Sequence, residues 1–289
     1  MRLAITADLH WGHRRGQSAT THLAERVRAE PPDLLLLGGD IGTGVHFEDC
    51  LGLFGDLDCA KAVVPGNHDI WVPPDETSHD SLDLYERILP EAAARQGFHY
   101  LDRSPLFFPE EGLAVVGSIN WYDYSWGLEG LTTFFPEELE RLHSKRFTRG
   151  RHNDAVFVRW PLDDIRFTSL VAGTLERHCE QAIHTGSRLI VVTHHPAIRG
   201  LSFPRTRQPR ELDEFLWEAF CGNVGVEQIL ARYAPWINYL FCGHTHRIRE
   251  SHWEGIAGYN VGSDYPMKRL LWLDWPGGSI TVEEFHEDA

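Results

Sequence analysis

Short apolar runs, each followed by an acidic residue, most constrain how this chain can fold. Residues 2–7, 34–37 and 60–64 are largely apolar and of strand length, and an Asp stands within five residues of the end of each run. Segments with helical periodicity fill the intervals, at residues 18–30 and 47–54. Strand, polar loop and helix in repeated order are typical of an α/β fold, in which ligands gather at the carboxyl ends of the strands. The sequence therefore predicts a buried sheet with one polar edge.

The rest of the chain continues this pattern with one long interruption. Further strands are predicted at residues 98–101, 106–108, 113–119, 188–193, 236–242, 247–253, 256–261, 269–274 and 279–284. Further helices are predicted at residues 82–96, 162–185, 209–220 and 226–233. Residues 126–160 lack clean periodicity apart from a short helix at 136–143. We expect one domain, residues 1–289, with an insertion within about 70–160 that walls a pocket.

Charge and hydropathy exclude several classes of protein. The 289 residues carry a formal net charge of −15, and 42% of them are hydrophobic. An acidic chain lacks the Lys and Arg that displace counterions from long nucleic acids, so we expect no polynucleotide partner. No run of about 20 apolar residues and no secretory signal occurs, so we expect no membrane partner and a cytoplasmic location. Composition does not predict the oligomeric state.

Potential metal ligands follow the predicted strands. They occur in five short motifs, which are Asp8-x-His10, Gly39-Asp40, Gly66-Asn67-His68-Asp69, His194-His195 and Gly243-His244-Thr245-His246. Together the motifs supply carboxylates, one carboxamide and several imidazoles. Oxygen ligands alone favour Mg or Ca, whereas this mixture favours Mn, Fe, Co, Ni or Zn. The sequence therefore predicts a site for two divalent or mixed-valence transition-metal ions.

The order of these motifs resembles the signature of the calcineurin-like metallophosphoesterase superfamily. That signature is D-x-H, G-D, G-N-H-[D/E], H and G-H-x-H, and all its parts are present between residues 8 and 246. The resemblance implies a four-layer α/β/β/α sandwich with a central mixed β-sandwich. It also implies the ligands, which are Asp8, His10 and His246 for the first ion, Asn67, His194 and His244 for the second, and Asp40 as the bridge.

The resemblance also implies roles for residues beside the ligands. His68 is not a ligand in this pattern but lies beside the leaving group, where Asp69 is expected to orient it. In the pair His194-His195 the ligand is assigned to His194, because the family's ligand stands two residues before a Pro, here Pro196. His195 is then expected either to face the pocket or to pack as an ordinary side chain.

The activity implied by the resemblance is hydrolysis of a phosphoric ester. Two ions share a bridging hydroxide that attacks phosphorus, while His68 assists the leaving group. We expect a small phosphorylated substrate and favour a phosphodiester over a phosphomonoester. The alternative is a catalytically silent metal-binding scaffold of the same fold, and the complete ligand set argues against it.

Several residues outside the motifs are predicted to contact the substrate. They are His195, Arg14, Trp121, Tyr122, Asp123 and Arg205. An Arg can bind a phosphate or carboxylate, and an aromatic ring can stack on a flat organic group. A solvated loop for the arginines and packing against the core for the aromatic rings remain the alternatives. Two further polar segments, residues 151–154 and 262–266, are assigned no chemistry.

Overall fold

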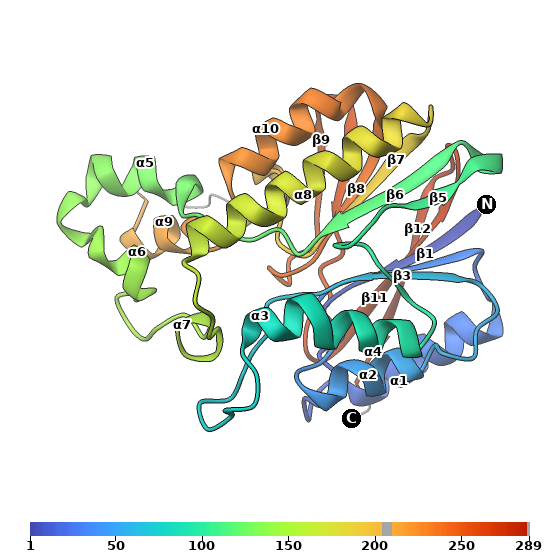
Figure 1. Cartoon of the computed structure of the whole chain (residues 1–289), viewed down its shortest axis with the longest axis horizontal. Coiled ribbons are helices and arrows are strands. Elements are labelled where there is room, and N and C mark those ends of the chain that lie inside the picture. Colours follow the sequence, from blue (N-terminus) through green and yellow to red (C-terminus); the bar gives the residue numbers. More distant parts are fainter. Residues whose placement is uncertain (204–209, 288–289) are drawn as a thin grey trace.

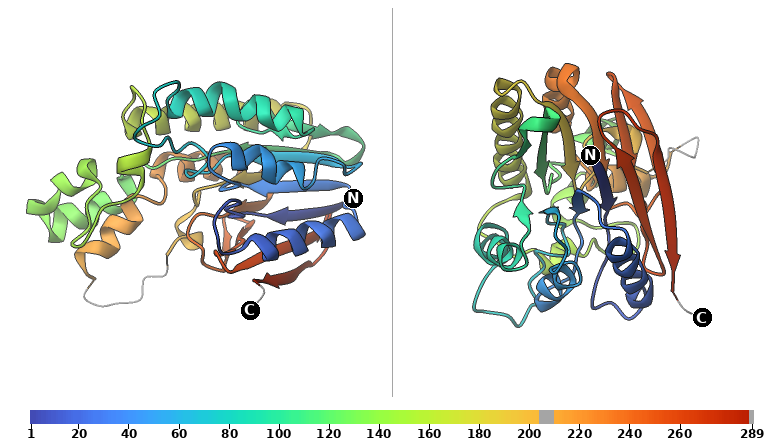
Figure 2. Two further views of the ribbon diagram at one scale, coloured as in Figure 1. Left: turned by 90° about the horizontal axis from the view of Figure 1, so that it is seen from below. Right: turned by 90° about the vertical axis from the view of Figure 1, so that its right-hand side faces the viewer.

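Two mixed β-sheets packed face to face form the centre of the protein. The computed structural model describes residues 1–203 and 210–287, and in that part of the chain each sheet has six strands (Figure 1). Helices cover the outer faces of both sheets, which gives four layers in the order α/β/β/α (Figure 2). This arrangement confirms the fold class predicted from the sequence.

The first sheet has the strand order β12-β11-β1-β2-β3-β4. Its strands are β1 (Arg2–Thr6), β2 (Leu34–Gly38), β3 (Ala60–Val64), β4 (His99–Tyr100), β11 (Met267–Asp274) and β12 (Ile280–His286). Strands β1 to β4 are parallel, whereas β11 and β12 add antiparallel pairs at one side. The helices on this side of the sandwich are α1 (Gln17–Ala29), α2 (Val45–Gly52) and a continuous run of α3 (Ser81–Asp83), the π-helical η1 (Leu84–Ile88) and α4 (Leu89–Arg95).

The second sheet has the strand order β5-β6-β7-β8-β10-β9. Its strands are β5 (Leu106–Phe108), β6 (Leu113–Ser118), β7 (Arg188–Thr193), β8 (Ile237–Cys242), β9 (Arg249–Trp253) and β10 (Ile256–Asn260). Helices α8 (Asp164–His184) and α10 (Val224–Tyr233) lie on its outer face (Figure 1). Among the described residues no helix, not even the 21-residue α8, is long and apolar enough to cross a membrane.

Apolar side chains at successive positions of the strands bury both faces of each sheet. Leu3 and Ile5 of β1 point into the apolar layer between the sheets, where they meet Val192 and Phe241 of the second sheet. The intervening Ala4 points to the other face and joins the cluster that contains the helices α1 and α2. Since successive side chains of a strand point to opposite faces, a continuous apolar run is what a sheet covered on both sides requires.

Four short helices gather at one end of the sandwich (Figures 1 and 2). They are α5 (Ser125–Phe134), α6 (Glu140–Ser144), α7 (Asp154–Phe157) and α9 (Leu212–Ala219). The sequence did not predict α5, because Gly127 and Gly130 weaken its helical pattern. The structure shows why glycine stands there: a Cβ at Gly127 would lie 2.8 Å from the Ala219 Cβ, and one at Gly130 would collide with the Phe215 ring. Close packing of α5 on α9 therefore requires both glycines.

Candidate metal centre

The predicted ligands lie together where the parallel strands end. Asp8, Asp40 and Asn67 follow β1, β2 and β3, while His194 and His244 follow β7 and β8. Backbone hydrogen bonds fasten these loops to one another, from Asp8 N to Gly39 O at 2.9 Å and from Gly243 N to His194 O at 3.0 Å. The carboxyl edges of the two sheets therefore form one site.

The backbone of this site adopts an unusual conformation. Asp8, His10, Asp40, His244 and His246 all have positive φ angles, between 47° and 71°. In the described part of the chain only nine non-glycine residues do so. L-residues in this conformation are strained and concentrate at functional sites, where surrounding contacts hold them. More than half of these non-glycine positions in the described residues are thus predicted ligands.

One cluster of donor atoms consists of Asp8, His10, Asp40 and His246, whose ligand atoms all lie within 4.8 Å of one another. The Nε2 atoms of His10 and His246 are 3.0 Å apart. His10 Nε2 lies 3.6 Å from Asp40 Oδ2, and His246 Nε2 lies 3.9 Å from Asp8 Oδ1. Two imidazole nitrogens and two carboxylates therefore converge on one small volume.

A second cluster lies on the other side of Asp40. His194 Nε2 is 3.1 Å from Asn67 Oδ1 and 3.3 Å from Asp40 Oδ1. His244 Nδ1 is 3.2 Å from the same Asn67 oxygen. Asp40 therefore turns Oδ2 toward the first cluster and Oδ1 toward the second, which is the arrangement that a bridging carboxylate requires.

Three hydrogen bonds orient the predicted ligands from outside. His194 Nδ1 lies 3.0 Å from Gly38 O, and Asp8 Oδ1 accepts the backbone N–H of His244 at 2.9 Å. His246 Nδ1 lies 3.2 Å from Asp264 Oδ1. A carboxylate behind a ligating imidazole fixes its tautomer and raises its basicity. Sequence reasoning assigned Asp264 only to a turn, because nothing near it in the chain signals a partner 18 residues away.

Electrostatics place three of these groups, His10, His244 and Asp40, in forms that bind metals. Burial lowers the pKa of His10 and of His244 well below the ordinary value, so both imidazoles are neutral at pH 7. Burial alone would raise the pKa of Asp40, but the charges of His194 and His68 hold it well below its ordinary value. Neutral imidazoles and an ionised carboxylate are the protonation states that coordinate a cation.

The donor set fits transition-metal ions. Asp8 Oδ2 is buried and has no hydrogen-bond partner among the described residues. Burial would lower the pKa of His194, but the charge of Asp40 raises it to about 9, so the site favours a positive charge beside the two aspartates. Nitrogen and oxygen donors in this mixture suit Mn, Fe, Co, Ni or Zn. A cation would satisfy both the unpartnered oxygen and the concentrated negative charge.

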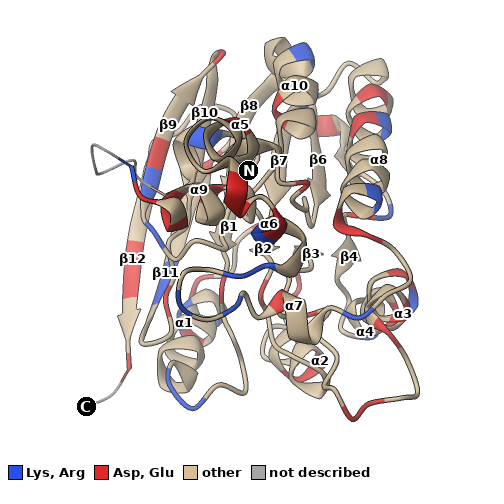
Figure 3. Cartoon of the chain, turned by 90° about the vertical axis from the view of Figure 1, so that its left-hand side faces the viewer, with Lys and Arg blue, Asp and Glu red and all other residues tan. Residues whose placement is uncertain are grey.

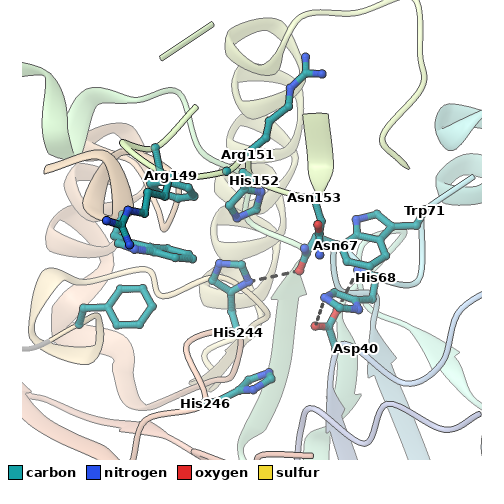
Figure 4. A pocket seen from close by; sticks show the side chains of 14 residues that line it. Asp40, Asn67, His68, Trp71, Arg149, Arg151, His152, Asn153, His244 and His246 are labelled. Carbon is teal, nitrogen blue, oxygen red and sulfur yellow. Dashed lines mark hydrogen bonds and ion pairs between the residues drawn. The ribbon is translucent and has the colours of Figure 1, made fainter. Parts of the chain in front are cut away.

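His68 lies beside these clusters and faces a cavity. Its Nε2 is 3.9 Å from Asp40 Oδ2, and its ring packs edge-on against His10 at 4.7 Å. The indole of Trp71 stacks on its other side, with the ring centroids 3.6 Å apart and the planes 25° from parallel (Figure 4). Burial lowers the pKa of His68 from its ordinary value. His68 therefore lies beside the two groups of candidate ligands without belonging to either, and its role stays a prediction.

The expected role of Asp69 is wrong. Its carboxylate accepts the backbone N–H of Gly42 at 2.8 Å and that of Gly66 at 2.7 Å, and no hydrogen bond joins it to the His68 ring in the described residues. Asp69 is fully buried and therefore ties the loop after β2 to the loop after β3. It positions the backbone that carries Asp40 and does not orient His68.

The aromatic residues predicted to stack on substrate are core residues instead. Trp121 and Tyr122 are fully buried. Trp121 donates its indole N–H to Asp164, and Tyr122 donates its hydroxyl to Asp154. Buried polar groups of aromatic rings need such acceptors, and both lie more than 30 residues away in the sequence.

The remaining predicted contacts that lie in the described part of the chain do not line the cavity. Asp123 Oδ1 accepts the backbone N–H of Ser125 at the start of α5, and Arg14 is exposed on a loop. His195 is fully buried and does not line the cavity, but its ligand atom lies within 4.8 Å of those of His194 and His244. Arg205 lies outside the described residues.

A cavity of about 380 Å³ opens above the two clusters. Its floor contains predicted ligands and His68, and its walls come from Trp71, from the segment 147–153 and from α9 (Figure 4). Phe147 and Trp217 stack on each other with centroids 4.4 Å apart. Arg149 is exposed in this wall and has no hydrogen bond or ion pair with the described residues. Sequence reasoning noted the polar segment 151–154 but missed the aromatic wall, whose members come from three separate parts of the chain.

An α/β/β/α sandwich with carboxylate, carboxamide and imidazole groups clustered at one shared edge is suited to hold metal ions. The sequence model of the calcineurin-like phosphoesterase family matches residues 1–248. The chain belongs to this family and is a phosphoric ester hydrolase.

Solved structures share the fold at low sequence identity. The phosphopantetheinyl hydrolase PptH of Mycobacterium tuberculosis is 20% identical, with a TM-score of 0.67 over 91% of this chain and 89% of that one. A dimetal phosphatase from Danio rerio is 13% identical, with a TM-score of 0.60 over 99% of this chain and 96% of that one. A comparison with curated protein sequences found no match.

Proposed function

We propose that this protein is a dinuclear-metal phosphoesterase that hydrolyses a small organic phosphoester, with a phosphodiester preferred over a phosphomonoester. One observation carries the proposal. The two oxygens of Asp40 face two separate clusters of imidazole donors, 3.6 Å from His10 and 3.3 Å from His194. A single mononuclear site would need neither the second cluster nor a carboxylate turned toward both.

Each residue of the site then has a distinct task. Asp8, His10 and His246 would hold one ion, Asn67, His194 and His244 would hold the other, and Asp40 would contribute to both. When bound, such a pair lowers the pKa of water and offsets the charge on the phosphoryl oxygens. The positive φ angles of five of these residues indicate that the folded chain arranges the ligands in advance.

His68 is proposed to act on the leaving group. It lines the cavity and lies 3.9 Å from Asp40 without belonging to either cluster of ligand atoms. The negative charge of a bound phosphoryl group favours the protonated form of a nearby imidazole. His68 then donates a proton to the departing oxygen, which matters most for the poor leaving group of an alkyl phosphodiester.

The cavity supports a small organic substrate. About 380 Å³ is within the range of sites for small ligands, and the wall combines the rings of Trp71 and Phe147 with the charge of Arg149. PptH is named for hydrolysis of a phosphopantetheinyl group, which joins a phosphate to an organic arm. We infer that this chain takes a substrate of the same general class, with the organic group against the rings.

Long nucleic acids are poor candidates for the substrate. The chain carries a net charge of −15, and the basic residues of the α6–α7 segment lie among acidic ones at this end of the molecule (Figure 3). Binding a polynucleotide requires a run of phosphate contacts from Lys and Arg. A short phosphate-bearing molecule needs only the site itself and one neighbouring cation.

A metal-screened hydrolysis assay tests the proposal. The metal-free protein is loaded with Mn²⁺, Fe²⁺, Co²⁺, Ni²⁺ or Zn²⁺ and offered bis-p-nitrophenyl phosphate or p-nitrophenyl phosphate. We expect turnover of both only with metal, and a higher kcat/KM for the diester. Faster hydrolysis of the monoester would overturn the diester preference. Two bound metals without turnover of either compound would favour the silent scaffold.

A further inference from the structure

Asp154, at the start of α7, is a buried carboxylate with an unusual set of partners. It is fully buried, and its Oδ1 accepts the Asn67 side-chain N–H at 2.9 Å and the Trp71 indole N–H at 2.7 Å. Its Oδ2 accepts the Tyr122 hydroxyl at 2.9 Å and lies 3.3 Å from His152 Nδ1. Asp154 directly follows the segment 147–153, which walls the cavity, and it contacts both a predicted ligand and the stacking partner of His68.

The contact with Asn67 decides which end of its amide faces the ions. A carboxamide presents an oxygen that can bind a cation and an NH₂ group that cannot. Asp154 holds the NH₂ group, so Asn67 Oδ1 is turned toward His194 at 3.1 Å and His244 at 3.2 Å. Without an acceptor at this position, the two orientations of the Asn67 amide would differ little in energy. In about half of the molecules the NH₂ group would then replace Oδ1 as the group that faces His194 and His244.

The contact with Trp71 acts on the other side of the site. The indole N–H is anchored at 2.7 Å, and the ring lies 3.6 Å from His68, nearly parallel to it. A stacked, anchored ring restricts the rotation of the imidazole and holds it beside Asp40. Figure 4 shows Trp71, His68 and Asp40 in succession along one wall of the cavity.

Hydrogen bonds hold both oxygens of Asp154 in place. Oδ1 accepts from Asn67 and Trp71, and Oδ2 accepts from Tyr122. Each of these donors therefore has an acceptor inside the protein.

We propose that Asp154 is a positioning residue for the hydrolysis, which fixes the ligand face of Asn67 and anchors the ring that holds His68. Through Asp154 the wall formed by residues 147–153 is tied to the metal centre. The inference rests on the proposed function, and metal binding provides a test that does not depend on turnover.

The experiment compares Asp154→Ala with Asp164→Ala, a matched control. Asp164 is also buried and accepts a Trp indole and a Tyr hydroxyl, but it contacts no predicted ligand. Titration of Mn²⁺ into the metal-free proteins should show affinity at one site weakened about 10- to 100-fold in Asp154→Ala and unchanged in Asp164→Ala. The kcat should fall with the affinity, while KM stays near that of the natural protein.

Asp154→Asn should restore both quantities, because its carboxamide oxygen can still accept from Asn67 and Trp71. Native Mn²⁺ affinity and kcat in a folded Asp154→Ala variant would overturn the proposal, as would failure of Asp154→Asn to rescue. If Asp154→Ala does not unfold cooperatively and so is not properly folded, Trp71→Phe replaces it as the test. This variant keeps an aromatic ring stacked on His68 but loses the indole N–H that Asp154 accepts. A lower kcat with unchanged Mn²⁺ affinity supports the proposal, and an unchanged kcat overturns it.

A natural protein that binds Mn²⁺ without turnover refutes the proposed function and leaves the affinity test of Asp154 intact.

Discussion

A single methyl group added at Gly66 should displace the residue that bridges the two clusters. A Cβ at this position would lie 2.8 Å from Asp40 Cγ, and closer still to its Oδ1 and backbone N. Carbon atoms in ordinary contact are about 3.5–4.0 Å apart, so the Asp40 carboxylate must move by roughly 0.7 Å or more. Misplacement of a catalytic group by about 1 Å can reduce turnover on the order of 100-fold. We expect Gly66→Ala to lose about that factor in kcat and to bind metal more weakly.

The assay measures Mn²⁺ affinity and hydrolysis of bis-p-nitrophenyl phosphate for Gly66→Ala beside Gly173→Ala. A Cβ at Gly173, in helix α8, would meet only Arg177 Nη1, at 3.9 Å. That control should keep its activity and gain about 0.5–1 kcal/mol in the free energy of unfolding, as glycine in a helix is unfavourable. Native affinity and kcat in Gly66→Ala would refute the reasoning, since Asp40 would then be free to move without consequence.

Three further predictions concern separate parts of the molecule. His68→Ala should keep both metals and lose about 10²- to 10⁴-fold in kcat, because it removes the proton donor but no ligand; metal loss measured by calorimetry would contradict this role. Arg149→Ala should raise KM for a substrate with a second anionic group about tenfold and leave kcat unchanged. The control is Arg151→Ala, which should change neither constant, because the Arg151 side chain bonds to Ser144 O and points away from the predicted ligands in Figure 4. Equal effects of the two variants would show that Arg149 does not bind the substrate. Burial raises the pKa of Asp102 to about 6 from an ordinary 3.8. Since the folded state holds this proton more tightly, the natural protein should lose about 3 kcal/mol of stability as the pH rises from about 4 through about 6, above which the loss levels off. Asp102→Asn lacks this titration. Its free energy of unfolding, measured by urea titration, should therefore rise relative to that of the natural protein over the same pH interval. A difference between the two proteins that does not change with pH would contradict the assignment.

The strand ends were the most predictable part of this protein. Apolar runs of strand length followed by Asp8, Asp40 and Asn67 predicted both the sheet and its polar edge, because parallel strands bring their carboxyl ends together. The choice of His194 over His195 stays a prediction: His194 Nε2 faces Asp40 Oδ1 at 3.3 Å, but the ligand atoms of His194, His195 and His244 all lie within 4.8 Å of one another. Local pattern and strand topology carry this information without any distant contact.

The errors share a physical cause, which is dependence on partners far away in the chain. Trp121 and Tyr122 were assigned to the substrate because they follow a predicted strand whose end could face the pocket, yet Asp164 and Asp154 accept their donors inside the core. Asp69 follows His68 directly, but the turn after β3 directs its carboxylate to the Gly42 and Gly66 amides. Sequence spacing gives neighbours along the chain, whereas the direction of a side chain is fixed by the fold.

The supporting residues of the site were missed for the same reason. Asp154 reaches Asn67 across 87 positions of the sequence. Asp264, which orients His246, lies beyond the residues that the family model matches. Neither residue belongs to a motif, and only the folded chain brings them to the metal centre.

The most direct test of the central claim is a crystal of the protein soaked with Mn²⁺ and measured for anomalous scattering. We predict two anomalous peaks, one on each side of the Asp40 carboxylate, the first among Asp8, His10 and His246 and the second among Asn67, His194 and His244. A single peak, or peaks away from Asp40, would contradict the dinuclear site on which the proposed function depends.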